Sequence, residues 1–235
     1  MTDIIIPLGT GSRFDDIELK FALRSVEKHL SNVRDVYVIG NWPDWLRNST
    51  VIKFEEKNLM IFKEKNICNK VSVACSLDNV SNDFLFMNDD HFLLADCDAA
   101  TFPYYHCGPI VQKVVDQYNP YRKVIRNTVQ LVGDRANNFD CHCPILFNQE
   151  IFFEVMNKID WEKDYGYMMK TLYCHGAGIE GKYIPDVKIN AELSVSDIKG
   201  IIYSRPWFSV GDAGLRTPMF SVLEELYPHK SKWER

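Results

Sequence analysis

The sequence predicts an α/β fold in which helices cover a mainly parallel sheet. Three observations support this. Short β-branched runs alternate with stretches of helical periodicity. The run at residues 83–89 is apolar enough for a strand that is covered on both faces. The 235 residues, 46% of them apolar, suffice for one sizeable core, and no repeat or linker divides them. We expect one domain over residues 1–235.

The first half of the chain has the order strand, helix, strand, strand, helix, strand. Residues 3–9 (DIIIPLG) form a β-branched run that proline and glycine end. Residues 12–30 then carry apolar side chains at helical spacing, with Ser12 in a position suited to the N-cap. The other predicted elements of this half are strands at 35–40, 51–54 and 83–89 and a helix at about 62–77.

The second half predicts further helices and one more strand. Residues 108–118 and 148–159 are amphipathic, and Asn148 is placed to cap the latter helix. An apolar run near the C-terminus (RPWFSVGDAGL) ends in Gly211 and Asp212, and a short helix and a polar tail close the chain.

Composition narrows the class of protein. A net charge of −5 without a block of like charges argues against non-specific nucleic acid binding. No apolar stretch approaches the roughly 18 residues of a membrane span, and the N-terminus does not resemble a signal peptide. Seven cysteines at scattered spacings are typical of reduced thiols, so we expect a cytoplasmic protein. We interpret Cys141 and Cys143 as buried thiols, not as half of a zinc site.

The loop after the first strand is a candidate nucleotide site. Ligands of parallel α/β sheets bind beyond the carboxyl ends of the strands. The loop there contains glycine and leads into a helix N-terminus, whose free amides suit a phosphate. A plain strand-to-helix turn is an equally good interpretation. The loop residues are Pro7, Leu8, Gly9, Thr10 and Gly11.

The stretch FLFMNDDHFLL places Asn88, Asp89, Asp90 and His91 at the end of the apolar run. Adjacent carboxylates at a strand end repel unless solvent or a cation compensates them, and such oxygen ligands suit Mg²⁺ or Mn²⁺. The alternative is a solvated turn, which Asn and Asp also favour. His91 is expected to be a structural neighbour. His142, taken alone, is also expected to be a hydrogen-bonded structural residue.

Four separated blocks resemble the Stealth family of sugar-phosphate transferases. The segment RFDDIELKFALRSVEKHLSNVRDVYVIGNWPDWL is similar to the start of its second region, and SNDFLFMNDDHFL to the end of that region. CHCPILFNQEIF is similar to the third region, and FSVGDAGL with LYPHKSKWE to the fourth. The family's first motif, WVDG, is replaced by PLGTGS, so the aspartate found there is missing, although Arg13 and Asp16 retain the adjoining pattern.

The resemblance implies a Rossmann-type sandwich like that of GT-A glycosyltransferases, with a nucleotide-sugar-binding half at 1–95 and an acceptor-side half at 96–235. It implies a metal-dependent transferase that moves a sugar from a nucleotide sugar, first among them a UDP-sugar, to an acceptor hydroxyl. There are two alternatives: a transferase that moves sugar-1-phosphate, and a non-catalytic module that binds a sugar or a nucleotide sugar.

The leading hypothesis gives individual residues candidate roles. Mn²⁺ or Mg²⁺ would bind to Asp90 with Asn88 or Asp89, and Asp212 would approach it. Asp89 and Asp212 are also catalytic candidates. Arg13 and Arg24 are candidates for diphosphate contacts, because guanidinium groups match phosphate oxygens. For Arg24, on a helix, a bracing role is slightly the better interpretation. His142 would complete the metal coordination or act as a base toward the acceptor hydroxyl.

The sequence leaves the acceptor open between a glycan and a modified DNA base, the latter if the protein is encoded by a phage and not by a bacterium. The net negative charge weighs against DNA. A group of lysines keeps it open, although such a run is more often a solvated face. These are Lys57, Lys63, Lys65 and Lys70.

Overall fold

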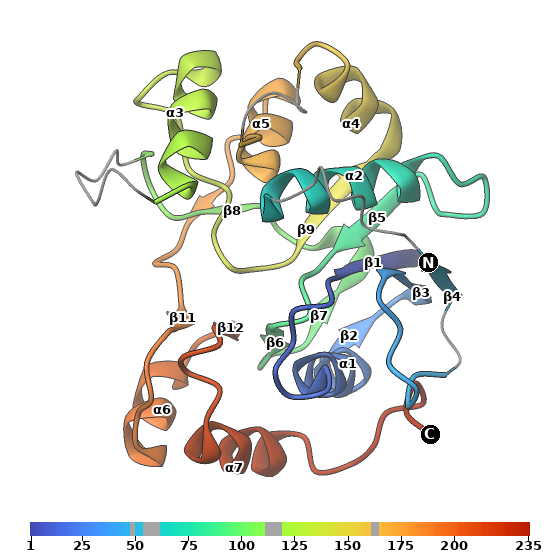
Figure 1. Ribbon diagram of the computed structural model, residues 1–235, viewed down its shortest axis with the longest axis vertical. Coiled ribbons are helices and arrows are strands. Elements are labelled where there is room, and N and C mark those ends of the chain that lie inside the picture. Colours follow the sequence, from blue (N-terminus) through green and yellow to red (C-terminus); the bar gives the residue numbers. More distant parts are fainter. Residues whose placement is uncertain (48–49, 54–61, 111–118, 161–164) are drawn as a thin grey trace.

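A computed structural model describes residues 1–47, 50–53, 62–110, 119–160 and 165–235. Within these residues the central sheet has five strands in the order β4-β3-β1-β5-β9 (Figure 1). The first four run parallel, and β9 pairs antiparallel with β5 at the edge. The predicted mainly parallel sheet is confirmed. The strands are β1 Thr2–Leu8, β3 Val33–Gly40, β4 Thr50–Lys53, β5 Asp83–Phe86 and β9 Ile145–Asn148.

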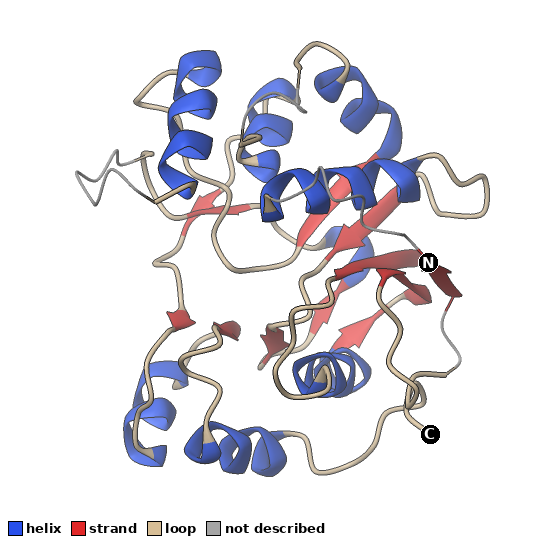
Figure 2. Cartoon of the chain, in the orientation of Figure 1, coloured by secondary structure: helices blue, strands red, loops and turns tan. Residues whose placement is uncertain are grey.

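Helices cover both faces of this sheet, as Figure 2 shows. Helix α1 lies under one face, and α2, α4 and α5 lie over the other, with α3 beside α5. Helices α6 and α7 pack on each other beyond α1. Their bounds are α1 Ile17–His29, α2 Lys63–Cys75, α3 Tyr121–Val132, α4 Gln149–Met156, α5 Met169–Gly176, α6 Val195–Ile202 and α7 Thr217–Leu226.

Strand β1 shows why the N-terminal run is apolar without interruption. Successive side chains of a strand point to opposite faces. Ile4 and Ile6 belong to the core under α1, whereas Ile5 belongs to the core under α2, and all three are fully buried. A strand between two helical layers therefore has no polar face, which is the pattern expected of parallel sheets.

A second, smaller sheet joins the C-terminal run to the chain that follows β5. It consists of β11 (Lys188–Ile189), β12 (Trp207–Val210) and β6 (His91–Leu93), with β12 antiparallel to β6. Its pairing places the end of β12 beside the carboxyl end of β5. Short pairs complete the strands: β2 (Leu30–Ser31) with β7 (Cys97–Asp98), next to the 3-10 turn η1 (Ala99–Thr101), and β8 (Tyr105–His106) with β10 (Lys182–Tyr183).

The C-terminal tail is held by α1 and by the segment after β3. Glu234 forms an ion pair with Arg24 at 2.7 Å, and the Arg47 amide donates to the Trp233 carbonyl at 2.8 Å. The Stealth-like sequences LRS, PDWL and KSKWE thus meet in one place. Their contacts fasten the C-terminal tail to the rest of the fold.

The start of α1 corrects one prediction. Ser12 is not the N-cap, because Asp15 and Asp16 adopt positive φ angles of 54° and 52° and delay the helix to Ile17. The Ser12 hydroxyl instead accepts hydrogen bonds from the amides of Phe14 and Asp16, which closes the loop before the helix.

Most other predicted elements are confirmed, including the Asn148 cap, whose side chain accepts from the Ile151 amide. Strand β5 ends three residues before the predicted end at residue 89. The chain turns there, and the Asn88 amide donates to the His91 ring within this turn. Most of the helix predicted at 108–118 lies outside the described residues, as does Lys57. Among the described helices, none has the length and apolarity to cross a membrane.

Candidate active site

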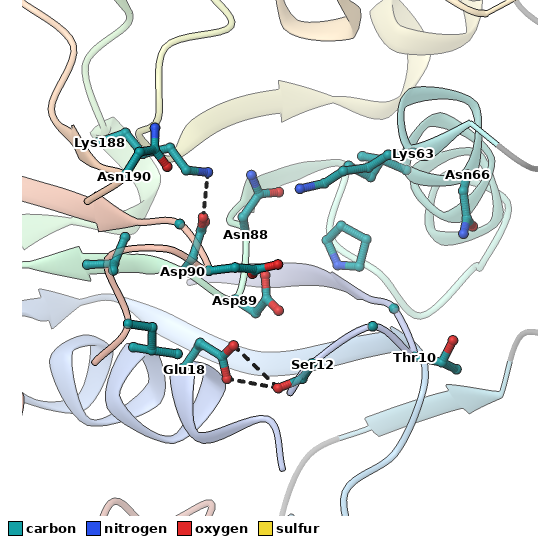
Figure 3. Close-up of a pocket in the computed structure, with 18 of the residues that line it drawn as sticks. Thr10, Ser12, Glu18, Lys63, Asn66, Asn88, Asp89, Asp90, Lys188 and Asn190 are labelled. Atoms are coloured by element: carbon teal, nitrogen blue, oxygen red, sulfur yellow. Dashed lines mark hydrogen bonds and ion pairs between the residues drawn. The ribbon is translucent and has the colours of Figure 1, made fainter. Parts of the chain in front are cut away.

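A cleft of ≈ 710 Å³ opens at the carboxyl ends of β1, β5 and β12 (Figure 3). It is where the doubly covered sheet predicts a ligand. Segments far apart in the sequence meet there: the first loop and the start of α1, helix α2, the acidic turn, the segment at β11 and the C-terminal run. The polar and charged residues that line it include Thr10, Ser12, Glu18, Lys63, Asn66, Lys70, Asn88, Asp89, Asp90, Lys188, Asn190 and Asp212.

The first loop forms one wall of the cleft through Pro7, Gly9, Thr10 and Gly11. Leu8 is fully buried in the core and is not among the lining residues. The Lys70 ammonium donates to the Leu8 carbonyl at 2.7 Å and thereby ties α2 to the loop.

Gly40, at the end of β3, makes this contact possible. A Cβ at Gly40 would lie 2.0 Å from the Leu8 carbonyl oxygen and 2.8 Å from Lys70 Nζ. The backbone φ of 125° is also one that only glycine adopts readily.

The acidic turn at residues 88–90 is held from below by His91. The His91 ring is fully buried, and its Nδ1 accepts a hydrogen bond from the Asn88 amide at 3.2 Å. Because Nδ1 accepts, a neutral ring carries its proton on Nε2, which lies 3.8 Å from Asp90 Oδ1. The structural role predicted for His91 therefore includes shaping this turn.

The two carboxylates of the turn have different electrostatic surroundings. Burial, and then the neighbouring Asp90 charge, raise the pKa of Asp89 to about 7. Burial also opposes ionisation of Asp90, but the Lys188 ammonium 2.9 Å away outweighs it and lowers the pKa of Asp90. Asp90 is thus a stable anion beside a carboxylate that ionises only near neutrality.

Lysines provide the positive charge of the cleft. Lys188 reaches Asp90 from β11, and Lys63 extends toward the same turn from the start of α2, as Figure 3 shows. Sequence reasoning missed Lys188, because β11 is only two residues long and its neighbours are known only from the pairing with β12.

Glu18 is a second residue that sequence reasoning did not assign to the site. It lies in the first turn of α1, it is buried, and burial raises the pKa of its carboxyl. The Ser12 hydroxyl donates to this carboxyl at 3.1 Å. An acidic residue in a first helical turn is ordinarily explained by the macrodipole, so no pattern distinguished it.

Of the other site residues predicted from the sequence, Asp212 belongs to the cleft, whereas Arg13 and Arg24 do not. Asp212 lines the cleft just beyond β12. Arg13 is exposed and is not among the lining residues. Arg24 faces away: its guanidinium donates two hydrogen bonds to Glu234, at 2.8 and 2.7 Å, so the bracing role that sequence reasoning left open is the one observed.

His142 lies outside the cleft lining, on the loop before β9. Its Nδ1 is 2.6 Å from Asp186 Oδ2, and its backbone amide donates to Asp186 Oδ1 at 2.8 Å. Asp186 precedes the cleft residue Lys188 by two positions. Burial above all, and among the smaller causes a positive charge on His142, lower the pKa of His91.

The donor chemistry of the acidic turn fits a divalent cation. Asp90 Oδ1 is buried and has no hydrogen-bond partner within the part of the chain that the structure describes. Carboxylate and amide oxygens are the ligands that Mg²⁺ and Mn²⁺ prefer. As the side chains stand, no three His, Cys, Asp or Glu residues among those described are gathered to hold a metal.

Part of the chain matches a known protein family. Residues 13–108 match the family model described as Stealth protein CR2, conserved region 2. The chain contains a Stealth conserved region 2. The Stealth region runs from the loop before α1 to the end of β8 and includes the acidic turn, whereas the first loop, His142 and Asp212 lie outside it.

Solved structures share the fold of the whole chain. The apo structure of the bifunctional glycosyltransferase WbbM matches with a TM-score of 0.55 at 12% identity, over 97% of this chain and 50% of that one. The galactosyltransferase LgtC, in complex with donor and acceptor sugar analogs, matches with 0.52 at 12% identity, over 98% and 97% of the two chains. An active-site mutant of LgtC gives 0.51 at 12% identity, over 98% of both chains.

These likenesses confirm the predicted GT-A-like fold and, at such identities, the fold alone. The chain spans about half the length of the WbbM structure that it matches. No curated protein sequence matches it. Together with the Stealth region, the fold supports a transferase related to the glycosyltransferases.

Proposed function

We propose that the protein transfers a glycosyl group from a nucleotide sugar to an acceptor hydroxyl, with a divalent cation bound at the acidic turn. The observation that carries this proposal is the cleft itself. It brings a glycine-containing loop, an acidic turn and the side chains of Lys63 and Lys188 to one end of a parallel sheet. A diphosphate needs this combination of amides, cations and metal-binding oxygens.

The donor would lie between the first loop and the acidic turn. Gly9, Thr10 and Gly11 line the cleft and would present their amides to the nucleotide. Lys63 and Lys188 would contact the diphosphate in place of the candidates Arg13 and Arg24. Lysine binds phosphate as a point charge, and both ammonium groups are directed toward the turn (Figure 3). A uridine diphosphate sugar is the first donor to test.

Asn88, Asp89 and Asp90, with Asp212, would hold Mn²⁺ or Mg²⁺. When bound, such an ion neutralises the charge that develops on the departing diphosphate. His142 would accept the proton of the acceptor hydroxyl, because a neutral imidazole can serve as a general base and Asp186 orients the ring.

The match to the Stealth region favours a second reaction at the same site. Attack on the β-phosphate would transfer sugar-1-phosphate and release nucleoside monophosphate, whereas glycosyl transfer releases nucleoside diphosphate. A screen of nucleotide sugars with Mn²⁺, in which both nucleotide products are quantified, distinguishes the two.

Calorimetry with the same nucleotide sugars tests whether the protein is a non-catalytic binding module. Calorimetric binding of a nucleotide sugar without turnover, with glycan and modified-DNA acceptors both supplied, would support that class. If the protein neither binds nor turns over any uridine or guanosine diphosphate sugar, the proposed function is wrong. All seven cysteines are free, which favours the reducing cytoplasm of a bacterium or of a phage-infected cell as the location that we propose.

A further inference from the structure

We propose that Asp186 is a positioning residue that fixes the tautomer of His142, so that Nε2 is the proton acceptor for the incoming hydroxyl. The catalytic part of this inference rests on the proposed function. The tautomer itself is a property of the free protein and is tested separately below.

The Asp186 carboxylate holds His142 at two points. Oδ1 accepts from the backbone amide at 2.8 Å, and Oδ2 lies 2.6 Å from the ring Nδ1. An ionised carboxylate can only accept hydrogen bonds, so Nδ1 carries the proton and the lone pair of a neutral ring is on Nε2. A carboxylate on one ring nitrogen is a recurring way to fix the tautomer and direction of an imidazole.

The backbone that carries His142 is anchored from the core. Cys141 and Cys143 are 1% and 2% exposed, and their sulfur atoms lie 3.4 Å apart. The buried Lys170 ammonium donates to both of their carbonyls, at 2.5 and 3.2 Å. With its two neighbours directed inward, His142 is directed outward to Asp186. The loop that carries the ring is therefore tied to the core on both sides of His142.

The pair lies next to the cleft in the chain, although neither residue is among those that line it. Asp186 is two residues before Lys188, whose ammonium binds Asp90 at 2.9 Å. The pKa of the His91 ring, which holds the acidic turn, is lowered mainly by burial and to a smaller extent by a positive charge on His142. The His142 side chain is about one-third exposed (32%), so the ring is accessible to an acceptor hydroxyl from solvent.

In the proposed glycosyl transfer, the acceptor oxygen forms a bond to the anomeric carbon while the bond from that carbon to the diphosphate oxygen breaks. The hydroxyl proton moves to His142 Nε2, and nucleoside diphosphate leaves with the bonding electron pair. The adjacent Asp186 carboxylate then stabilises the imidazolium.

Asp186 is ionised in this arrangement. Burial opposes its ionisation, but the hydrogen bonds and charge of His142 outweigh burial and lower the pKa of Asp186. Other titratable groups around the pair must be considered in any pH profile. They are His91, Cys107, Tyr121, Asp140, Cys141, Cys143 and Lys170.

The first test is NMR of the imidazole nitrogens in the wild-type protein, without substrate. At a pH where His142 is neutral, we expect its proton on Nδ1, which is the opposite of the preference of free histidine in water. A proton on Nε2 would overturn the proposal, and this measurement requires no variant to fold.

The second test is Asp186→Asn. The amide oxygen is needed by the His142 backbone N–H, which leaves the NH₂ group facing Nδ1. We expect the proton to move to Nε2 and turnover to fall by about 10²–10⁴-fold, the range of a lost general base. In the matched control Asp140→Asn the amide oxygen can still accept from the Thr171 amide, as Asp140 Oδ2 does now, and the His142 tautomer should be unchanged.

The two tests separate this inference from the proposed function. If His142 has the expected tautomer but no nucleotide sugar is turned over, the function is wrong and the positioning role of Asp186 survives. If the enzyme turns over and Asp186→Asn shifts neither the tautomer nor the pH profile of kcat, Asp186 is merely structural.

Discussion

Lys188 Nζ lies 2.9 Å from Asp90 Oδ2, and both side chains are largely buried, at 17% and 13% exposed. The ammonium thus compensates one of two adjacent carboxylates from a strand that is almost a hundred residues distant in the sequence. It occupies the side of the acidic turn where a diphosphate is expected.

Lys188→Gln is expected to destabilise the protein and weaken donor binding. Losing a charged hydrogen bond to a buried group costs about 1–3 kcal/mol, which lowers Tm by several degrees in a chain of this size. Thermal melts with and without Mn²⁺ provide the measurement, and the ion should stabilise the variant more than the wild type. Lys158→Gln, which breaks only an exposed pair with Glu154, is the control. Equal melting temperatures for both variants would contradict this role.

Asp90→Asn is expected to abolish metal-dependent turnover while the fold persists. The amide is nearly isosteric but lacks the charge that binds a cation, so we expect turnover to fall by at least about 10²-fold. Turnover is measured by nucleotide release, and folding by circular dichroism. Asp44→Asn, an exposed carboxylate away from the cleft, should have normal activity. Full activity of Asp90→Asn would remove the acidic turn from the mechanism.

His142→Ala should reduce turnover by about 10²–10⁴-fold, because a general base is lost. Donor affinity should be unchanged, since His142 does not line the cleft. Steady-state kinetics and calorimetry with the donor check the two parts. The exposed His229→Ala is the matched control. Unchanged turnover in His142→Ala would leave this histidine a structural residue.

Glu234→Gln is expected to lower stability in a pH-dependent way. Burial opposes ionisation of Glu234, but the hydrogen bonds from Arg24 and Ser231 outweigh it and lower its pKa below the ordinary 4.5. The unfolded chain therefore takes up this proton first as the pH falls. The contribution, about 1–3 kcal/mol, is fully present above pH 4.5 and is lost below it.

Denaturant unfolding of the wild type and Glu234→Gln at neutral pH and at pH 4 measures this difference. The gap between the two proteins should narrow at the lower pH. A gap that is constant with pH would show that the ion pair with Arg24 does not stabilise the C-terminal tail.

The sequence by itself determined the layers of the fold. Apolar runs of period two and helical stretches of period 3.6 are local patterns, so the parallel sheet, its covering helices and the Asn148 cap could be read from them. The acidic turn at residues 88–90 was also visible, because a charged end to a buried strand is a local anomaly. The Ser12 cap failed, since the left-handed Asp15 and Asp16 leave no pattern that propensity can detect.

Only the tertiary structure decided which side chains share a site. Lys188 meets Asp90, Asp186 meets His142, and Arg24 turns from the cleft to Glu234 because strand pairing and helix packing bring together segments that are 98, 44 and 210 residues apart. A hydrogen bond depends on distance in space, whereas sequence patterns report distance along the chain. The first kind of information exists only once the sheet has fixed the ends of its strands.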